Sequence, residues 1–289
     1  MTAPTPRPDD RIGLRDAAAR LGVHYMTAYR YVRLGVLPAT KVGGEWQVRL
    51  ADLEQVTRRD DAPPRSGSGP SWSRYRTQFV TRLRAGDEAG AWALVERALA
   101  SGAEARDVHL ELVGPSLRVI GALWEQGDIE VAEEHRASAV AQRVIGRLGP
   151  SFARRGRKRA TVVIGAAPED RHSLPTAILG DILRGEGLDV VDLGADTPAR
   201  SFVDAARDRD DVVAVAVSVG SDATVANAGD VASAVHRDLP GVALFIGGPA
   251  VGDESTARAL GADEYGASAL DVARRCLELA AARSRGRAR

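Results

Sequence analysis

Residues 158–285 alternate between short β-branched runs and longer helical stretches, and this alternation strongly limits the possible fold. The strand-like runs lie at residues 160–166, 189–193, 212–218 and 242–246. Helical patterns lie around residues 173–186, 198–207, 224–237 and 268–283. Strand–helix alternation predicts a doubly wound, Rossmann-like parallel sheet with right-handed crossovers. Such sheets bind ligands at the carboxyl ends of their strands, and the lack of a GxGxxG turn after the first run argues against a nicotinamide site.

The sequence pattern of the preceding segment, residues 72–150, predicts helix throughout. Apolar residues recur at helical spacing over residues 72–84, 87–100, 104–125 and 129–148. Asp87 is placed to cap the second helix, and Pro115 should disturb the third. Four helices with short connections predict an antiparallel four-helix bundle.

Two breaks divide the chain into three predicted domains, at residues 1–59, 72–150 and 158–285. Residues 60–71 hold turn formers and no apolar side chain larger than alanine, which is typical of a flexible linker. Residues 149–159 interrupt the apolar periodicity with Gly, Pro and five Lys/Arg. The single cysteine rules out an intramolecular disulfide, and no long apolar run could span a membrane. We therefore expect a cytoplasmic protein with no membrane partner.

Residues 12–57 follow the order helix, tight turn, helix, hairpin. Leu14–Val23 should form a helix that ends in a glycine turn, and His24–Arg33 a second helix with Thr27, Arg30 and Arg33 on its polar side. Residues 39–42 and 45–49, joined by two glycines, predict a hairpin. Asp52 is expected to cap a closing helix. Residues 1–60 hold ten Lys/Arg against seven Asp/Glu, a net charge of +3.

This segment resembles the winged helix-turn-helix domains of the MerR and excisionase type. The resemblance implies that Thr27, Arg30 and Arg33 face the major groove of double-stranded operator DNA. It also implies that Lys41 and Arg49 contact phosphates near the wing. The alternative is that these arginines only solvate a helix surface.

Two histidines stand beside carboxylates in suggestive places. His172 closes an Asp170-Arg-His172 sequence just after the first strand, where ligand-binding loops belong. One imidazole nitrogen could ligate a metal while the other donates to Asp170, although a loop histidine capped by its neighbour fits the spacing equally. Trp124 ends one bundle helix, and Glu134-His135 lies on the next. These three could converge at the end of the bundle, or be a core Trp and a solvated pair.

The order of these motifs resembles the cobalamin-binding module of the CarH/LitR-type photoreceptor repressors, and more distantly that of methionine synthase, over residues 72–285. The resemblance implies an adenosylcobalamin cofactor (coenzyme B12) with His172 as lower axial cobalt ligand and Asp170 as its carboxylate partner. It implies further cofactor-binding residues on the upper face and at the nucleotide tail: Trp124, Glu134, His135, Ser218, Gly247 and Gly248.

Three positions depart from that family's pattern. Pro175 replaces a glycine three residues after the ligand histidine, and Val219-Gly220-Ser221 follows Ser218 in place of the usual Ser-x-Leu or Ser-x-Thr. Glu125 stands directly after Trp124, where the photosensors generally have the histidine that captures cobalt after illumination.

The sequence therefore predicts a non-enzymatic transcription regulator that self-associates as a dimer or tetramer. In the resembled family the dark, adenosylcobalamin-bound tetramer occupies DNA, and green light releases it. Linking several copies compensates for the few phosphate contacts that one small domain makes. One alternative keeps this fold but senses another cobalamin form, another tetrapyrrole or no cofactor. A second alternative is a corrinoid carrier subunit for methyl transfer, against which the DNA-reading segment argues.

Overall fold

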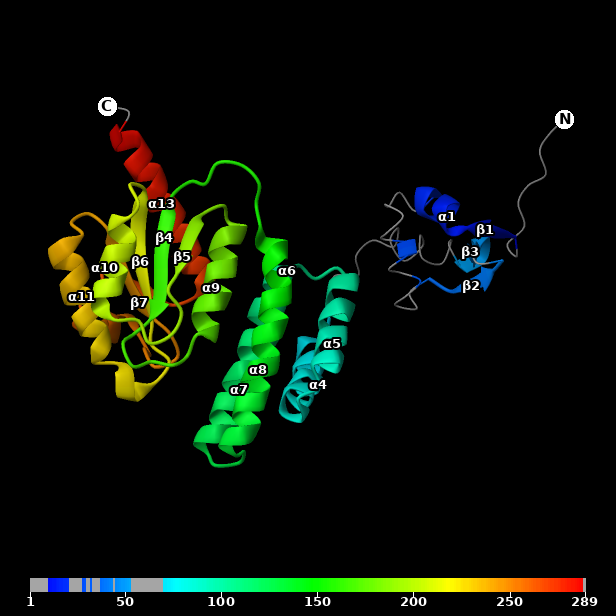
Figure 1. Cartoon of the computed structure of the whole chain (residues 1–289), viewed down its shortest axis with the longest axis horizontal. Helices are drawn as coiled ribbons and strands as arrows, with labels where there is room; N and C mark the ends of the chain where they lie inside the picture. Colours follow the sequence, from blue (N-terminus) through cyan, green and yellow to red (C-terminus); the bar gives the residue numbers. More distant parts are fainter. Residues whose placement is uncertain are drawn as a thin grey trace. The chain divides into compact units, whose positions relative to one another are not determined.

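The computed structural model describes residues 10–20, 28, 29, 32, 37–43, 45–52 and 70–287. The chain forms two compact units, residues 1–69 and 70–289, which are described separately below (Figure 1). Thr27, Arg30 and Arg33, together with residues 60–69 of the expected linker at residues 60–71, lie outside the described residues. None of the described helices is long and apolar enough to cross a membrane.

The N-terminal unit contains a small antiparallel sheet beside a helix. Its described elements are β1 (Arg11–Gly13), α1 (Leu14–Arg20), β2 (Ala39–Val42) and β3 (Glu45–Arg49), with sheet order β1-β3-β2. The predicted hairpin is confirmed, with Ala39 opposite Val48 and Val42 opposite Glu45. Strand β1 was not predicted, because three residues give too little alternation to be recognised. Buried Leu14, Ala17 and Val48 form part of the core of this unit.

The prediction that Asp52 caps the closing helix is wrong. The closing helix already includes residue 50, so Asp52 lies inside its first turn. There the Asp52 carboxylate accepts a hydrogen bond from Arg49 Nε at 3.2 Å. An acid in the first turn still favours the helix, because the amino end carries partial positive charge.

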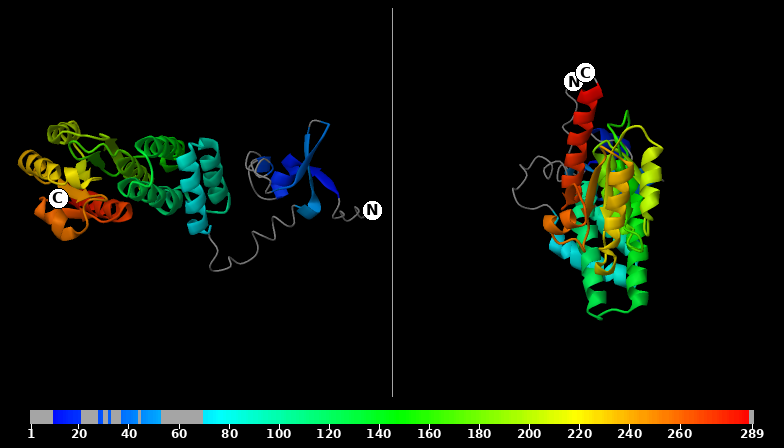
Figure 2. Two further views of the ribbon diagram at one scale, coloured as in Figure 1. Left: turned by 90° about the horizontal axis from the view of Figure 1, so that it is seen from below. Right: turned by 90° about the vertical axis from the view of Figure 1, so that its left-hand side faces the viewer.

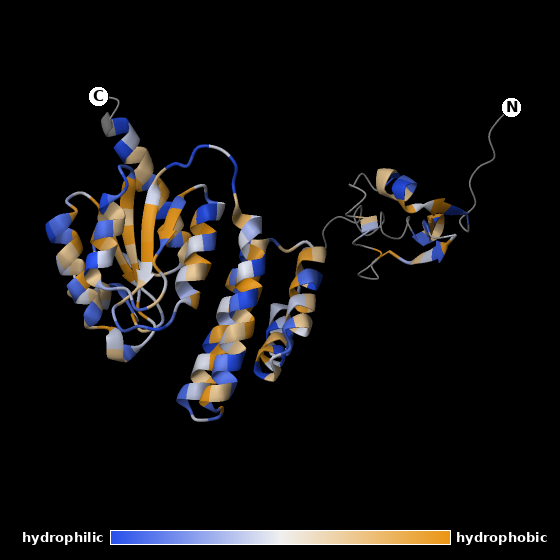
Figure 3. Cartoon of the chain, in the orientation of Figure 1, coloured by the Kyte–Doolittle hydropathy of each residue, from blue (hydrophilic) through white to orange (hydrophobic). Residues whose placement is uncertain are grey.

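The C-terminal unit begins with a helical bundle. Its elements are α4 (Trp72–Ala85), α5 (Glu88–Ala100), α6 (Ala105–Asp107), η1 (Val108–Val113), α7 (Gly114–Glu125) and α8 (Val131–Leu148). Asp87 caps α5 as predicted, accepting the Gly90 N–H at 2.8 Å. Figure 3 shows the apolar stripes along these helices, whose buried members include Phe79, Leu94 and Val144.

The predicted disturbance at Pro115 takes the form of a π-helical segment. Proline lacks an N–H and its ring crowds the carbonyl four residues earlier, so the regular ladder cannot pass through it. The segment η1 widens the turn just before this point, and the Gly114 N–H bonds to the His109 carbonyl five residues back. Pro115 then occupies the first turn of α7, directly after the π-helical segment.

A five-stranded parallel sheet follows, with order β5-β4-β6-β7-β8 (Figures 1 and 2). The strands are β4 (Thr161–Ala166), β5 (Asp189–Asp192), β6 (Val212–Ser218), β7 (Ala243–Gly247) and β8 (Glu264–Gly266). The helices are α9 (Leu174–Gly185), α10 (Ala199–Arg207), α11 (Asn227–Asp238), α12 (Glu254–Ala259) and α13 (Ala269–Arg287). The Rossmann-like prediction is confirmed, while β8 and α12 were missed.

Bundle and sheet share one core, since buried side chains of α5, α8, α9, β4 and α13 belong to a single apolar cluster. A buried polar contact crosses the same junction. His109 in η1 is fully buried, its Nε2 lies 2.9 Å from Asp181 Oδ2 on α9, and its ring stacks on Phe152 with centroids 5.0 Å apart. These contacts fix α9, the helix that follows the His172 loop, against the bundle.

Candidate functional site

The strand order puts the expected ligand crevice between β4 and β6. In a doubly wound sheet of order 2-1-3-4-5, the crossovers leave the first and third strands in opposite directions, which opens a crevice at their carboxyl ends. Here those strands are β4 and β6, and their last residues Ala166 and Ser218 are register partners. Ser218 is in turn the partner of Gly247, the last residue of β7. The carboxyl ends of β4, β6 and β7 therefore lie side by side at the same end of the sheet.

The loop after β4 is held in an unusual backbone conformation. Glu169 has φ of 67° and Asp196 has φ of 49°, and they are the only non-glycine residues with positive φ in the described part of the chain. The Glu169 N–H donates to Asp196 Oδ1 at 2.7 Å, and the Asp196 N–H donates to the Asp170 carbonyl at 2.7 Å. Such left-handed residues are costly and cluster at functional sites. Their contacts fix the position from which the Asp170 side chain projects.

Asp170 orients the imidazole of His172. The Asp170 side chain is fully buried, whereas that of His172 is 57% exposed. Asp170 Oδ1 accepts both the His172 Nδ1–H at 2.6 Å and the His172 backbone N–H at 3.0 Å. Because Nδ1 is engaged as a donor, Nε2 is the nitrogen left for a ligand. This is the arrangement that fixes tautomer and ring direction in metal-ligating histidines.

The electrostatics of the pair follow from the same contacts. Burial opposes ionisation of Asp170, but hydrogen bonds from the His172 ring and the Gly220 amide prevail and lower the pKa of the Asp170 carboxyl. The hydrogen bond to Asp170 raises the pKa of the His172 imidazole, burial opposes this, and the charges of Asp170 and Glu134 raise it further. Asp170 is therefore a carboxylate that favours positive charge at His172.

Gly220 is part of this site, although the sequence pointed to it only as a departure from a motif. Its N–H donates to Asp170 Oδ2 at 2.5 Å, so both carboxylate oxygens are engaged. A Cβ on Gly220 would lie 2.7 Å from His172 Nδ1 and 2.9 Å from His172 Cβ. The imidazole thus packs on bare backbone, and only glycine leaves it room. The two residues are far apart in sequence, so no local pattern could have revealed the contact.

Gly247 and Gly248 are required by the protein's own backbone. A Cβ on Gly247 would come within 2.4 Å of the Gly266 carbonyl oxygen on β8. Gly248 has φ of +113°, and a Cβ there would lie 2.5 Å from the Val219 carbonyl oxygen. The resemblance implied that both glycines bind the cofactor, but the close approach seen here is between neighbouring strand ends. These packed turns shape the edge on which Ser218 lies.

Part of the bundle motif faces the same site. Glu134, in the first turn of α8, lies near enough to His172 for its charge to raise the pKa of that imidazole. Glu134 also accepts the Ser138 hydroxyl at 2.6 Å, and its side chain is 27% exposed. His135 lies beside Glu134, with Nε2 and Oε2 3.7 Å apart, but is 74% exposed. Trp124 is 49% exposed on the last turn of α7, too open for the core role considered above.

These residues fit a metal that brings most of its own ligands. Nowhere in the described segments do three or more His, Cys, Asp or Glu side chains converge on a possible metal position. A tetrapyrrole supplies the equatorial ligands of its metal and asks the protein only for an axial group such as histidine. His172, with Nε2 uncommitted and its ring half exposed, offers such a group. The donor set therefore fits a corrinoid.

Two of the departures from the resembled pattern lie at helix ends. Pro175 lies in the first turn of α9, where a proline completes a helix start without breaking a hydrogen bond. Glu125 is the last residue of α7 and is exposed. No imidazole therefore stands at the position from which the photosensors take their second histidine, and His135 is the histidine nearest to it along the chain.

Of the five residues expected to bind DNA, only Lys41 and Arg49, both on the hairpin, belong to the described residues. Lys41 on β2 is exposed, and its Nζ lies 6.0 Å from the centroid of the Trp46 ring. Arg49 on β3 is also exposed but pairs with Asp52. The remaining three residues, Thr27, Arg30 and Arg33, lie outside the described residues.

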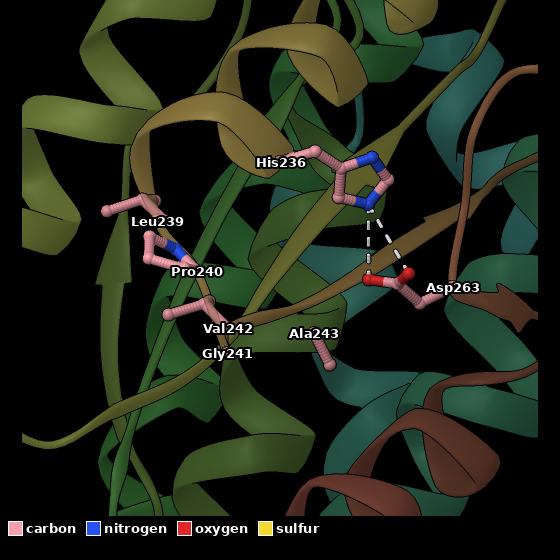
Figure 4. A pocket seen from close by; sticks show the side chains of 7 residues that line it. All are labelled: His236, Leu239, Pro240, Gly241, Val242, Ala243 and Asp263. Atoms are coloured by element: carbon pink, nitrogen blue, oxygen red, sulfur yellow. Dashed lines mark hydrogen bonds and ion pairs between the residues drawn. The ribbon is translucent and has the colours of Figure 1, made fainter.

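A hollow of about 320 Å³ lies beside the amino-terminal end of β7, away from the carboxyl ends of the strands (Figure 4). It is lined by His236 and residues 239–243, and Asp263 closes one side. His236 Nε2 lies 3.3 Å from an Asp263 oxygen, and Asp263 also accepts the Leu244 N–H at 2.8 Å. Asp263 thereby fixes the start of β7, which gives this hollow a structural explanation.

Comparison with protein-family models identifies three domains in the chain. A B12 binding domain model matches residues 75–148, a second B12 binding domain model matches residues 160–274, and a helix-turn-helix domain model matches residues 13–60. The chain thus carries a helix-turn-helix domain followed by two B12-binding domains.

Similar proteins agree with the corrinoid part of this description. Trimethylamine corrinoid protein 1 of Methanosarcina acetivorans is 29% identical over 193 residues, which cover 64% of this chain and 88% of that protein. Its counterpart from Methanosarcina mazei is 28% identical over 180 residues, or 61% and 82% of the two chains. The structure of the Methanosarcina barkeri monomethylamine corrinoid protein covers 72% of this chain and 99% of its own, with a TM-score of 0.63 and 20% identity. That similarity establishes the fold.

Proposed function

We propose that this protein is a transcription regulator whose oligomeric state and DNA affinity depend on bound adenosylcobalamin, with light as the trigger. The observation that carries the proposal is the union in one chain of a helix-turn-helix domain with a corrinoid-type site at His172. A protein that only carries a corrinoid has no need to read DNA.

Separate groups of residues would hold different parts of the cofactor. Asp170 and Gly220 would hold the His172 ring so that Nε2 meets the metal. Trp124, Glu134 and His135 would line the face that the bundle presents to the cofactor. Ser218, Gly247 and Gly248 would form the edge along which the nucleotide tail runs. When bound, adenosylcobalamin supplies a light-sensitive cobalt–carbon bond.

The cofactor arrangement also suggests how a signal could reach the oligomer. Bundle and α/β domain share one core but meet near His172 through partly exposed side chains. A ligand between Glu134 and His172 would add contacts to both domains at once. Copies held together in this way would bring several helix-turn-helix domains to one DNA, where avidity replaces strong individual binding.

The test is an absorbance spectrum of the purified protein with adenosylcobalamin in the dark and under green light, with size-exclusion chromatography on each sample. We expect a His-ligated spectrum and a light-driven change in oligomer size. His172→Ala should lose the ligated spectrum. His236→Ala is the matched control, because His236 is also a half-exposed histidine beside an aspartate but lies away from the site. A bound spectrum without any change in size would instead indicate a sensor of cobalamin level.

A second candidate is a corrinoid carrier subunit for methyl transfer. It is favoured by the names of the similar proteins, which are trimethylamine corrinoid proteins. It is also favoured by Glu125, which stands where the photosensors have their second histidine. A gel-shift assay on the DNA upstream of its own gene separates the two, since a carrier should leave that DNA unshifted with or without cofactor.

A further inference from the structure

Five cationic side chains crowd the loop that joins the bundle to the sheet. Residues 153–159 contain no acid, and their cations are Arg154, Arg155, Arg157, Lys158 and Arg159. The four arginines are exposed and the lysine is partly exposed. This loop is the interruption that the sequence marked between the two predicted domains, and the cofactor site makes no use of it.

The charges of this loop are not neutralised locally. Within the part of the chain that the structure describes, no carboxylate lies within 4.0 Å of any of the five, and Lys158 Nζ donates only to the Arg154 carbonyl at 3.0 Å. Other exposed arginines of this unit behave differently. Arg200, Arg258 and Arg274 each pair with an acid one helical turn away on the same helix. The chain as a whole has no net charge, so this loop is a local concentration of positive charge.

The loop lies at the end of the sheet where the parallel strands begin. His172 lies at the opposite end, where the strands finish. It leads directly into β4, and the Arg159 N–H bonds to the Gly187 carbonyl just past the end of α9. Helix α13 reaches the same end of the sheet as the loop, where Arg283 donates to the carbonyls of Asp210 and Val212. The Thr161 N–H at the start of β4 bonds to the Asp211 carbonyl, which precedes β6. A ligand on the loop would not compete with a cofactor at the strand ends.

We propose that this basic loop binds the phosphate backbone of duplex DNA. The inference rests on the proposed function, because the helix-turn-helix domain is what brings DNA to this chain. Residues 1–60 carry a net charge of only +3, which leaves electrostatic affinity to be supplied elsewhere. Guanidinium groups match phosphate oxygens in geometry, and four of the five cations are arginines. The loop therefore adds phosphate contacts that carry no sequence preference.

The experiment measures how duplex binding by the full-length protein depends on salt, by fluorescence anisotropy. The DNA is a labelled duplex from upstream of its own gene, beside a scrambled duplex of equal length. Each cation that contacts a phosphate adds about 0.9 to the slope of log affinity against log salt. The variant Arg154→Gln/Arg155→Gln/Arg157→Gln should lower that slope by about 2 to 3, equally on both duplexes.

The matched control is Arg200→Gln/Arg258→Gln/Arg274→Gln, which removes the same charge from exposed sites elsewhere and should leave the slope within about 0.5 of wild type. Cobalamin spectra of both variants verify an intact sensor. Equal losses in the two variants would overturn the inference, because bulk charge would then explain the binding. Wild-type binding with no loss in the loop variant would also overturn it while leaving the proposed function intact. Failure of the wild-type protein to bind either duplex would overturn both.

Discussion

Replacing Gly220 with alanine should separate cofactor binding from folding. The new Cβ would lie 2.7 Å from His172 Nδ1, 2.8 Å from Cγ and 2.9 Å from Cβ. Carbon contacts are normally about 3.5–4.0 Å, so the imidazole must move by roughly 1 Å or more. That movement breaks the 2.6 Å hydrogen bond to Asp170. Gly220 does not have a positive φ, so alanine fits the backbone itself.

The size of the effect follows from what is lost. Disturbing the carboxylate partner of a metal-ligating histidine typically weakens metal binding about 10–100-fold, or about 1.4–2.7 kcal/mol. Folding should change less than cofactor binding, because the His172 side chain is 57% exposed, although the buried Asp170 carboxylate loses one of its hydrogen bonds. We expect Gly220→Ala to bind adenosylcobalamin about 10–100-fold more weakly, while its free energy of unfolding without cofactor falls by no more than about 2 kcal/mol.

The assay is a spectrophotometric titration with adenosylcobalamin, paired with urea unfolding of the cofactor-free protein. Gly146→Ala is the matched control, because Gly146 is exposed inside α8 and has nothing within 4 Å of its virtual Cβ. It should stabilise the protein by about 0.5–1 kcal/mol and leave cofactor affinity unchanged. If Gly220→Ala bound cofactor as tightly as wild type, the orientation of His172 by Asp170 could not matter for binding, and the reasoning would be refuted.

Three further outcomes follow from the same geometry. Asp170→Asn should also weaken cobalamin binding about 10–100-fold and cost about 1–3 kcal/mol in urea unfolding, because both Asp170 oxygens accept hydrogen bonds and an amide can offer only one acceptor. Gly248→Ala should destabilise the protein by about 2–4 kcal/mol in thermal unfolding, since its φ is +113° and the clashing atom is a backbone oxygen; a loss under 1 kcal/mol would contradict this. Burial raises the pKa of the Cys276 thiol to about 12, so Ellman's reagent should label it only as fast as the protein opens, and rapid labelling of the native protein would be the contrary result.

Elements with strong periodicity were predicted well. Strands β4, β5, β6 and β7 lie within a residue or so of the β-branched runs that predicted them, because buried parallel strands are nearly continuous apolar segments. The short elements β1, β8 and α12 were missed, since three to six residues cannot establish a period. The prediction of a cap at Asp52 was wrong because the sequence does not fix the first residue of a helix to within one or two positions.

The site was only partly foreseeable. The Asp170–His172 contact was expected from spacing and is present at 2.6 Å. The buried His109–Asp181 pair was not anticipated, because its members are on different domains and neither has a distinctive sequence neighbourhood. Convergence of the bundle motif is partial, with Glu134 near His172 but His135 and Trp124 largely open.

The sequence by itself determined the class of each segment and the residues that could carry chemistry. Hydrophobic period and turn residues are local properties, and they suffice to predict a parallel sheet, a helical bundle and a helix-turn-helix. Only the tertiary structure decided which of the candidate residues meet. The register of β4, β6 and β7 brings Asp170 to Gly220, and the packing of the bundle on the sheet brings Glu134 toward His172. Contacts between residues distant in sequence depend on strand order and interdomain packing, which no local pattern records.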